Sequence, residues 1–427
     1  MELKRVVVTG LGAITPLGND PQTYRDNLIA GVSGAGPITR FDPTDFKTQF
    51  ACEVKGFDVT EFIHRRDARR MDLFTQYAVV SSQQALNDAG VIAEGVEEEG
   101  SESKTRINPD RAGVIWGSGV GGFQSFMDEA KNFYQGDGTP RFSPFFIPMM
   151  IPDIAAGHIS IRNGLRGPNY CTVSACASST HALIDSFNLI RLGKADVIVT
   201  GGSEAAVTEG GIGGFNALKA LSTRNDDPQR ASRPFDKTRD GFVLGEGAGA
   251  IVLESLEHAQ ARGAKIYCEM VGGGMSADAH HITAPHPEGL GATNVMLATL
   301  DDAGMKPEEV DYVNVHGTST PLGDVAETQA IQRVFGESAY DLNISSTKSM
   351  TGHLLGAAGA IEAMAAILAV KNDIIPPTIN YEHEDEELDP KLDFTFNKAK
   401  ERTVEAALSN TFGFGGHNAS VLFKKFR

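Results

Sequence analysis

One pattern of the chain constrains its fold more than any other: a turn of small residues, then an apolar helix, then a buried strand. In the first copy, the turn Val173–Thr180 contains Cys176. A helix is predicted from Cys176 through residues 181–192, because the apolar side chains there fall on one face at helical spacing. Gly193 ends this helix, and residues 196–200 read as a buried strand. Units of this kind are typical of α/β proteins.

The same pattern returns in the second half of the chain. The turn Thr351–Gly356 leads into an apolar helix over residues 357–371, which is followed by the apolar pair Ile374-Ile375. Residues 310–315 form a strand that ends at His316. We therefore predict a duplicated α/β domain whose helices pack on mixed sheets, with one helix start from each half meeting at the centre.

Cys176 has two interpretations when its own segment is considered alone. A thiol at a helix N-terminus lies where unpaired N–H groups and the helix dipole favour negative charge, which predicts a pKa lowered toward the thiolate. A small buried cysteine without chemistry is the usual alternative. The local sequence does not decide between the two.

Length and composition exclude several classes of protein. The chain of 427 residues is long enough for two core-forming domains or one large duplicated domain. Its formal net charge of −17 argues against general nucleic-acid binding. The four cysteines form no CxxC pair, so they predict reduced thiols in a cytoplasmic protein rather than a zinc site or a disulfide framework. No signal peptide or membrane span is expected, since the most apolar stretch, residues 145–152, is short and contains prolines.

Four other segments carry expectations about organisation. Residues 6–10 form a first strand, and Gly10–Gly18 is interpreted as a turn rather than a nicotinamide site, because Thr15 replaces the third glycine of that motif. The acidic residues 94–102 read as a surface loop. Residues 142–152 are too apolar for an ordinary loop, so they line a subunit interface or an apolar pocket, with core burial as the alternative.

A basic cluster stands out in this acidic chain. Four arginines occur within residues 65–70 on a predicted helical turn. A charge run is most often a solvated face. The functional alternative is a docking site for an acidic partner, because guanidinium groups suit carboxylate and phosphate recognition.

Three residues are candidates for chemistry, since each lies at a strand or helix end among small residues: Cys176, His316 and His353. Lys348 and Glu362 add titratable groups close by in the sequence. A metal site built from the two histidines and the cysteine is the competing hypothesis, but no short ligand pair supports it. The glycine-rich segment 410–418 can bring backbone N–H groups close to an anion.

Four segments, in this order, resemble the β-ketoacyl-[acyl-carrier-protein] synthases: the turn around Cys176, His316–Thr320, Lys348–His353 and Phe412–Gly416. The similarity extends from Val6 to Phe426 and is greatest to the elongating synthase II branch. The second histidine distinguishes the chain from synthase III enzymes, which have asparagine there, and thiolases carry a second active-site cysteine instead. The small departures are Val120, where a bulkier isoleucine is common, and the acidic insertion.

The resemblance implies the thiolase fold: two similar halves, residues 1–255 and 256–427, in a five-layered α-β-α-β-α core, as a homodimer in the cytoplasm. It implies an acyltransferase that condenses acyl-carrier protein, bound as an acyl-Cys176 thioester, with malonyl-carrier protein in fatty acid biosynthesis. His316 and His353 would promote decarboxylation as neutral imidazoles whose tautomers a neighbour fixes, and Lys348 and Glu362 would shape their surroundings. The N–H groups of Cys176 and Phe414 would form the oxyanion hole, with the Phe414 side chain as a gate.

The resemblance also assigns residues that bind substrate, partner and ion. No cofactor is required. Those expected to line the acyl pocket and pantetheine channel are Val120, Phe146, Phe215, His281, Thr283, Thr318, Thr320 and Phe412. Those expected to dock the acidic carrier protein are Arg66, Arg69, Arg70, Lys219 and Arg224. Those matching a structural Na⁺ or K⁺ site are Asn314, Glu362, Ser409 and Asn410.

Three alternatives stay open at this point. A thiolase would need a second pocket cysteine, and Cys52, Cys171 and Cys268 lie in no matching motif. A chain-length-factor-like subunit would lack the nucleophile that Cys176 provides. A polyketide synthase shares the motifs, so the sequence decides neither the pathway nor the preferred acyl chain length.

Overall fold

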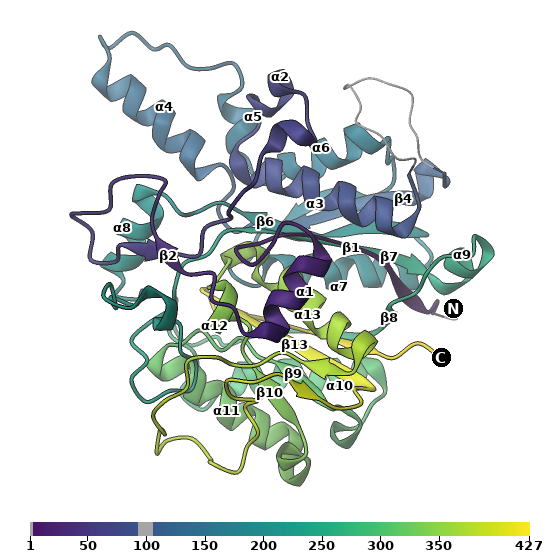
Figure 1. The fold of residues 1–427 in the computed structure, drawn as a ribbon. Helices are drawn as coiled ribbons and strands as arrows, with labels where there is room; N and C mark the ends of the chain where they lie inside the picture. The colour runs from purple at the N-terminus through teal and green to yellow at the C-terminus, as the bar shows by residue number, and fades with distance from the viewer. Residues whose placement is uncertain (1–2, 93–105) are drawn as a thin grey trace.

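The computed structural model describes residues 3–92 and 106–427, and its centre is a sheet of ten strands (Figure 1). Across the sheet the strand order is β10-β9-β13-β14-β8-β1-β7-β6-β4-β5. The strands of the N-terminal half are β1 (Val6–Ile14), β4 (Ala112–Gly117), β5 (Asn169–Thr172), β6 (Val197–Glu204) and β7 (Gly247–Ser255). Those of the C-terminal half are β8 (Cys268–Ala277), β9 (Tyr312–Asn314), β10 (Asn343–Ser345), β13 (Ala406–Gly413) and β14 (His417–Lys424).

The two sets of five strands have the same topology. From its outer edge inward, each set runs third, second, fourth, fifth and first strand in chain order. In each set the second strand pairs in parallel with the third and fourth, and the fifth strand is antiparallel to both of its neighbours. Only Val6–Val8 of β1 joins the sets, by antiparallel pairing with β8. The predicted duplication is therefore confirmed.

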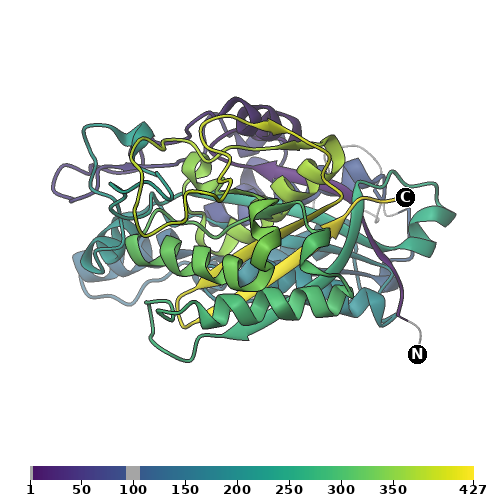
Figure 2. The ribbon, with the colours of Figure 1, turned by 90° about the horizontal axis from the view of Figure 1, so that it is seen from below.

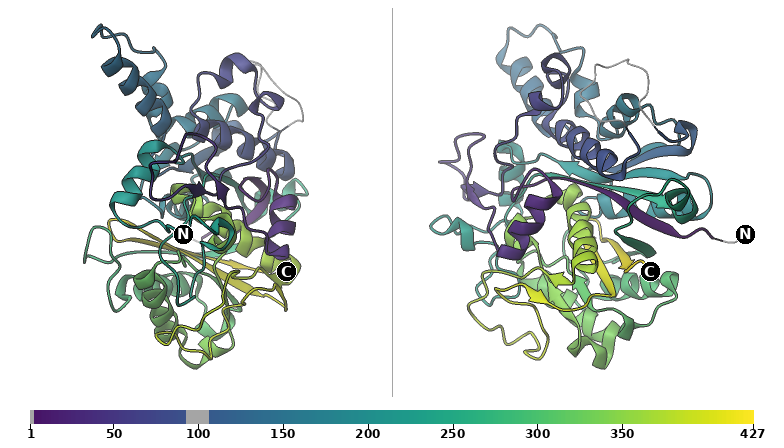
Figure 3. Two further views of the ribbon diagram at one scale, coloured as in Figure 1. Left: turned by 60° about the vertical axis from the view of Figure 1, so that its left-hand side comes forward. Right: turned by 45° about the vertical axis from the view of Figure 1, so that its right-hand side comes forward.

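Helices separate and cover the two sets of strands, giving five layers (Figures 1 and 3). Helices α3 (Leu73–Ala89) and α6 (Ile154–Asn163) cover the outer face of the N-terminal strands. Helices α10 (Leu290–Ala303) and α11 (Pro321–Phe335) cover the C-terminal strands, in front of which they lie in the view from below (Figure 2). The middle layer contains α7 (Ser178–Arg191) and α13 (Ala358–Asn372). The five-layered α-β-α-β-α prediction is confirmed.

The remaining elements are short or lie at the periphery. The helices among them are α1 (Pro21–Ala30), α2 (Arg65–Ala68), α4 (Phe123–Gln135), α5 (Phe146–Met150), α8 (Glu209–Ala217), α9 (Leu256–Ala261) and α12 (Lys348–Thr351). The strands are β2 (Gly36–Pro37) with β3 (Phe50–Ala51), and β11 (Ile374–Ile375) with β12 (Lys400–Glu401). Helix α4 projects away from the body of the molecule (Figures 1 and 3).

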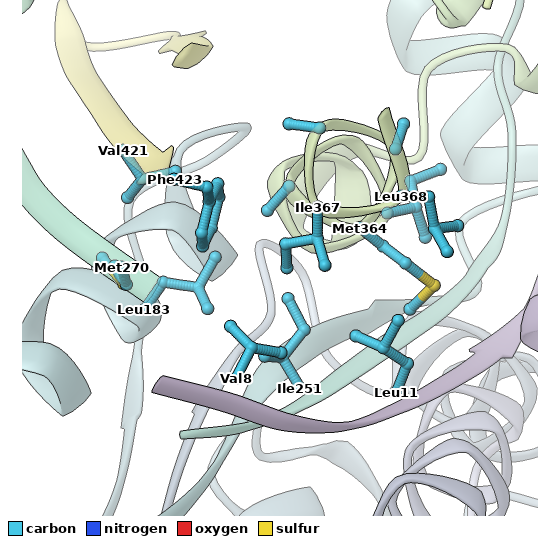
Figure 4. Close-up of a cluster of buried hydrophobic side chains, with 14 of the residues drawn as sticks. Val8, Leu11, Leu183, Ile251, Met270, Met364, Ile367, Leu368, Val421 and Phe423 are labelled. Carbon is cyan, nitrogen blue, oxygen red and sulfur yellow. The ribbon is translucent and has the colours of Figure 1, made fainter. Parts of the chain in front are cut away.

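Helix α13 forms the centre of the core because apolar side chains surround it on all sides. Met364, Ile367 and Leu368 point from α13 toward side chains of both halves (Figure 4). The N-terminal partners labelled there are Val8, Leu11, Leu183 and Ile251, and the C-terminal ones are Met270, Val421 and Phe423. Residues Leu355–Asn372 are long and apolar enough to cross a membrane, but most of them are buried inside the protein. This segment is a core helix.

The starts of α7 and α13 cross at very short range. A Cβ atom on Gly359 would lie 1.9 Å from Thr180 Oγ1, so only glycine allows this approach. The backbone N–H of Ala360 donates to Ser179 Oγ at 3.0 Å, which ties the two helix starts together. The prediction that one helix start from each half meets at the centre is confirmed.

The sequence-based boundary at the end of the first strand is wrong. Strand β1 continues to Ile14, and the turn covers only residues 15–18. The glycines interpreted as turn residues serve helix packing, since a Cβ on Gly12 would lie 1.9 Å from Ser81 O of α3. Residues 242–246 precede β7, and Leu244 makes a single bridge to His353. The acidic residues 94–102 lie outside the described residues, and the domain boundary at residue 255 stays a prediction.

Candidate active site

Cys176 lies in the turn between β5 and α7, two residues before the first helical residue. Ala175 has a φ of +50°, in the left-handed region that costs an alanine about 1–2 kcal/mol. Ser178 holds this conformation: its hydroxyl donates to Ala175 O at 2.6 Å and accepts the N–H of Ser174 at 2.9 Å. The turn is therefore kept in a strained shape, which is common where a structure positions a functional side chain.

Two imidazoles of the C-terminal half lie beside the thiol. His353 Nε2 is 3.0 Å from Cys176 Sγ, and the rings of His353 and His316 are nearly perpendicular, with centroids 5.3 Å apart. Backbone hydrogen bonds hold His353 on both sides: its N–H donates to Val243 O at 2.8 Å, and its carbonyl accepts the N–H of Gly245 at 2.9 Å. The three candidate residues of the sequence therefore meet at one point.

The protonation states differ from the sequence-based expectation for the thiol. Burial raises the pKa of Cys176 to about 12, although Lys348 and the N–H of Phe414 oppose the shift. The predicted lowering of this pKa is wrong, because loss of solvation outweighs the effect of the nearby helix start. Burial, with Lys348 as the next cause, lowers the pKa values of His316 and His353 well below the ordinary range. At neutral pH the resting site contains a thiol and two neutral imidazoles, and the thiol can donate to His353 Nε2.

A buried ion pair supports the imidazoles. Lys348 and Glu362 are in direct contact, and both side chains are almost fully buried. Burial raises the pKa of Glu362 to about 7, an effect that Lys348 opposes. The Nδ1 atoms of His316 and His353 have no hydrogen-bond partner among residues 3–92 and 106–427. No hydrogen bond at Nδ1 therefore fixes either tautomer in the described part of the chain, and for His353 the neighbour that can do so is the Cys176 thiol at Nε2.

The glycine-rich segment places backbone donors at the thiol. The backbone N–H of Phe414 opposes the rise in the pKa of the Cys176 thiol. A Cβ on Gly413 would lie 2.9 Å from Ser174 O and 3.2 Å from Cys176 N, so glycine is needed for this approach. The backbone N–H groups of Cys176 and Phe414 thus come from adjoining segments, as an oxyanion hole requires.

The three residues open into a cavity of about 490 Å³ between the halves. Most of the predicted substrate-binding residues line it: Val120, Phe215, Thr283, Thr318, Thr320 and Phe412. Phe414, the predicted gate, lies in the same wall, 6.4 Å from Phe215 between ring centroids. A cavity of this volume is typical of small-molecule sites.

Two predicted lining residues lie elsewhere in the single chain. Phe146 stacks on Phe126 and Phe142, at ring-centroid distances of 6.4 and 5.9 Å, beneath the projecting helix α4. The His281 side chain is bound to its own loop, because its Nδ1 accepts the N–H groups of Thr283 and Ala284, both at 3.1 Å. The prediction that these two residues line the cavity is wrong for one chain, because each side chain is engaged by its local neighbours.

The predicted docking residues lie at the surface of the N-terminal half. Arg66 and Arg69 of the α2 region are exposed, and the guanidinium of Arg70 lies 4.7 Å from the ring centre of Phe145. Lys219 is exposed at the mouth of the cavity. Arg224 is half-buried and donates to Thr238 O at 3.1 Å. Their role in docking stays a prediction.

The residues predicted to hold a cation are all buried. Asn314 of β9 and Ser409 of β13 are opposite each other in the sheet. Asn314 Oδ1 has no hydrogen-bond partner in the described part of the chain. Asn410 accepts from Ser420 at 2.9 Å and donates to Glu327 at 3.3 Å, and Glu362 contacts Lys348. An unpartnered buried carbonyl oxygen is a donor that suits Na⁺ or K⁺.

Sequence reasoning missed two buried glutamates that hold the site together. Glu327 of α11 accepts the backbone N–H groups of His316 and Gly317 at 2.9 and 2.8 Å, and burial raises its pKa to about 7. Glu204, the last residue of β6, accepts backbone N–H groups from both halves of the chain. The available signal was a carboxylate at the end of an otherwise apolar strand, where a charge needs a reason to be buried.

Comparisons with known proteins agree with this site. The model of the β-ketoacyl synthase N-terminal domain matches residues 3–259, and that of the C-terminal domain matches residues 267–382. The chain belongs to the β-ketoacyl synthase family. A curated relative from Synechocystis sp., named 3-oxoacyl-[acyl-carrier-protein] synthase 2, is 52% identical over 427 residues, which cover 100% of this chain and 99% of the relative.

Solved β-ketoacyl synthases share the fold over the whole chain. A β-ketoacyl synthase from Burkholderia phymatum is 37% identical with a TM-score of 0.89, and the alignment covers 99% of this chain and 100% of that one. A ketosynthase solved in complex with its type II PKS acyl-carrier protein is 31% identical with a TM-score of 0.87, at full coverage of both chains. The recognition of the family from four motifs is therefore confirmed.

Proposed function

We propose that this β-ketoacyl synthase is an acyltransferase of fatty acid synthesis that lengthens an acyl chain by two carbons, through decarboxylative condensation of acyl-carrier protein with malonyl-carrier protein. The observation that carries the proposal is the 3.0 Å contact between Cys176 Sγ and His353 Nε2 at the floor of the cavity. A nucleophile beside a base, with a second imidazole and two backbone donors, is the set of groups that this reaction requires.

The first half of the reaction transfers the acyl group. The Cys176 thiol passes its proton to His353 Nε2 while the sulfur attacks the thioester carbonyl. The N–H groups of Cys176 and Phe414 stabilise the oxyanion, each by about 3–4 kcal/mol as in other acyl-transfer sites. Collapse of the intermediate breaks the bond to the carrier's sulfur, which takes the proton from His353. The products are the acyl-Cys176 thioester and free carrier thiol.

The second half forms the carbon–carbon bond. Loss of carbon dioxide from malonyl-carrier protein leaves an enolate, whose oxygen accepts hydrogen bonds from His316 and His353. Both imidazoles must be neutral N–H donors when the enolate forms, and their lowered pKa values favour that state. The enolate carbon then attacks the acyl carbonyl of Cys176, and expulsion of the thiolate gives the 3-oxoacyl product. The side chain of Phe414, in the cavity wall, is placed to control malonyl entry.

The carrier protein is expected to dock on the basic residues of the N-terminal half. Arg66, Arg69 and Arg70 form one exposed cationic group, and Lys219 lies at the cavity mouth. The similar ketosynthase solved with its acyl-carrier protein supports a partner of this kind. Opposite charges on the two surfaces would speed their encounter.

The exposed aromatic cluster of α4 and α5 supports a homodimer. Phe126 of α4 and Phe142 of the connection to α5 are almost half exposed, and the more exposed Tyr134 and Ile147 lie on α4 and α5. A second copy of the chain would cover this apolar surface. We place the dimer in the cytoplasm, because the cysteines are unpaired and the one long apolar helix among residues 3–92 and 106–427 is the core helix α13.

A monovalent cation fits the residues behind the histidines. The free Oδ1 of Asn314, with oxygens of Ser409, Asn410 and Glu362, would hold Na⁺ or K⁺. The ion would add a fixed positive charge at this buried place. Asn314 and Ser409 belong to adjacent strands, and they would orient the ion's coordination.

Single-turnover condensation tests the proposed function. The protein is mixed with malonyl-carrier protein and a ladder of acyl-carrier proteins of increasing chain length. A 3-oxoacyl product two carbons longer, with release of one carbon dioxide per turnover, is expected. Acyl transfer without chain extension at any length would contradict the proposal.

A further inference from the structure

One carboxylate near the site is not used by the reaction. Glu204 ends strand β6 and is fully buried. In the described part of the chain, the groups that donate to it are all neutral: the N–H groups of Gly119 at 2.7 Å, Val120 at 3.1 Å, Gly121 at 3.3 Å and Gly356 at 3.0 Å, and the hydroxyl of Ser118 at 3.1 Å. Burial of a carboxylate costs several kcal/mol unless hydrogen bonds compensate. The cost of burying Glu204 therefore points to a role in connecting the segments that donate hydrogen bonds to it.

Three segments meet at Glu204 with no side chain between them. A Cβ on Gly356 would lie 2.2 Å from Gly119 N and 2.6 Å from Glu204 Oε2. A Cβ on Gly119 would lie 2.8 Å from Glu204 Oε2 and 3.4 Å from Ala175 O. We call this meeting point, formed by residues 118–121, Glu204 and Gly356, the glutamate junction.

The glutamate junction touches each part of the reacting site. Gly356 follows His353 by three residues, and Ala175 directly precedes Cys176. Val120 forms part of the cavity wall beside the acyl chain. The nucleophile and the wall belong to the N-terminal half, whereas His353 belongs to the C-terminal half, so the carboxylate links the two halves where they must be aligned.

We propose that Glu204 is a positioning residue that aligns Cys176 with His353 and sets the acyl wall at Val120. The inference rests on the proposed function, since it assigns the carboxylate a role in the acyl-transfer step. A shift of about 1 Å in such an alignment is enough to cost on the order of 100-fold in rate. The carboxylate also acts on the thiol directly, because its charge is one of the causes that raise the pKa of Cys176.

The test compares Glu204→Gln with a matched control, Glu254→Gln. Glu254 is also fully buried, and it accepts from Thr9, His258 and the charged Arg262, away from the cavity. Acyl transfer from acyl-carrier protein to Cys176 is followed by intact mass in single-turnover experiments. We expect Glu204→Gln to lower the rate constant about 100-fold with little change in KM, while Glu254→Gln keeps the wild-type rate constant. A Glu204→Gln rate constant within about twofold of wild type would overturn the proposal.

A second readout separates this inference from the proposed function. Alkylation of Cys176 by iodoacetamide needs no carrier protein, so it reports on the glutamate junction even if no condensation occurs. In Glu204→Gln its pH profile is expected to move to lower pH, because a charge that raises the thiol's pKa is removed. An unchanged profile would contradict the inference, whereas absence of condensation in the wild type would contradict the proposed function alone.

A milder variant keeps the test valid if Glu204→Gln does not fold. Ser118→Ala removes one of the five donors and leaves the carboxylate in place. We expect a loss of acyl-transfer rate of about threefold to tenfold, since one hydrogen bond to a charged group is removed. Full retention of the rate, and of the preference among acyl chain lengths, would count against the inference.

Discussion

The two halves of the molecule have the same topology but supply different chemistry at equivalent places. In each half, the connection from the third strand to the following central helix carries a reacting residue: Cys176 before α7, and His353 before α13. A residue with positive φ lies close to each, Ala175 at +50° and Leu355 at +47°. The duplicated fold thus delivers two equivalent loops to one point, and the side chains there divide the work between nucleophile and base.

Two further pairs of equivalent loops show the same division. After the second strand, the N-terminal half places Val120 in the cavity wall, whereas the C-terminal half places His316 there. At the end of the fourth strand, the N-terminal half has Glu204, and the C-terminal half has the segment of Phe412 and Phe414. In the proposed reaction, the N-terminal half would therefore hold the acyl chain, and the C-terminal half would handle protons, the enolate and access.

Removal of the nucleophile gives the largest expected effect. Cys176→Ser should lower acyl-enzyme formation by on the order of 10³-fold or more, because a hydroxyl is a far weaker nucleophile than sulfur beside the same neutral base. The fold should persist, since the change is small. Intact mass after incubation with acyl-carrier protein measures the effect. Full acylation of Cys176→Ser would show that the N-terminal half does not carry the nucleophile.

Removal of the equivalent residue in the C-terminal half should separate the two half-reactions. His353→Ala is expected to lower decarboxylation by about 10³-fold, since a donor to the enolate is lost. Acyl transfer to Cys176 should continue more slowly, and its rate should rise with pH. Burial raises the thiol's pKa, and the imidazole base that lies 3.0 Å from the sulfur in the wild type is gone. Carbon dioxide release and acyl-enzyme mass are followed separately.

The opposite pattern would contradict this division of roles. Normal carbon dioxide release by His353→Ala would remove the imidazole from the decarboxylation step. Acyl transfer that is independent of pH between 7 and about 10 would show that the thiol does not need to ionise without His353. His316→Ala is the matched control, because it removes the imidazole farther from the sulfur and should leave the pH profile of acyl transfer unchanged.

The sequence predicts the duplicated fold and the three reacting residues because local patterns carry that information. Small-residue turns before apolar helices are visible in the chain at both Cys176 and His353. The end of β1 could not be predicted in the same way, since Gly10 and Gly12 look like turn residues. Their role depends on helix α3, which is about 70 residues away in the chain and packs on their backbone.

The properties that depend on burial were harder to predict. A helix start alone indicates a lowered pKa for Cys176, but the thiol is enclosed by both halves, and desolvation dominates. Phe146 likewise stacks on Phe126 of α4, a neighbour that its own segment does not reveal. Glu204 and Glu327 were missed because their partners are backbone N–H groups, which every residue except proline has.

Removal of one member of the buried ion pair Lys348–Glu362 tests whether the pair stabilises the C-terminal half. Glu362→Gln leaves the Lys348 ammonium buried without its partner, so we expect a loss of about 3 kcal/mol in the free energy of unfolding. Urea denaturation monitored by Trp116 fluorescence measures it. The double variant Lys348→Met with Glu362→Gln should recover part of the loss. Equal stability of the wild type and Glu362→Gln would show that the pair does not stabilise this half.

Charge reversal at the basic group of the N-terminal half has the smallest expected effect. Arg66, Arg69 and Arg70 lie in the exposed α2 region and do not line the cavity. Replacement of the three by Glu should raise KM for carrier-protein substrates by about tenfold, since surface charges act mainly on encounter. Small thioester substrates lack the acidic surface, so their KM should not change.

Charge reversal at a matched set of residues in the C-terminal half decides whether docking depends on the local arginine surface of the N-terminal half or on the net charge of the protein. Three exposed lysines of that half change the net charge by the same amount when replaced by Glu: Lys306, Lys391 and Lys398. If docking is local, these replacements leave KM for carrier protein near the wild-type value, and the difference between the two triple variants shrinks at high salt. Equal increases in KM for both would mean that the carrier protein responds to the overall field, and the two halves would then share the task of attracting it.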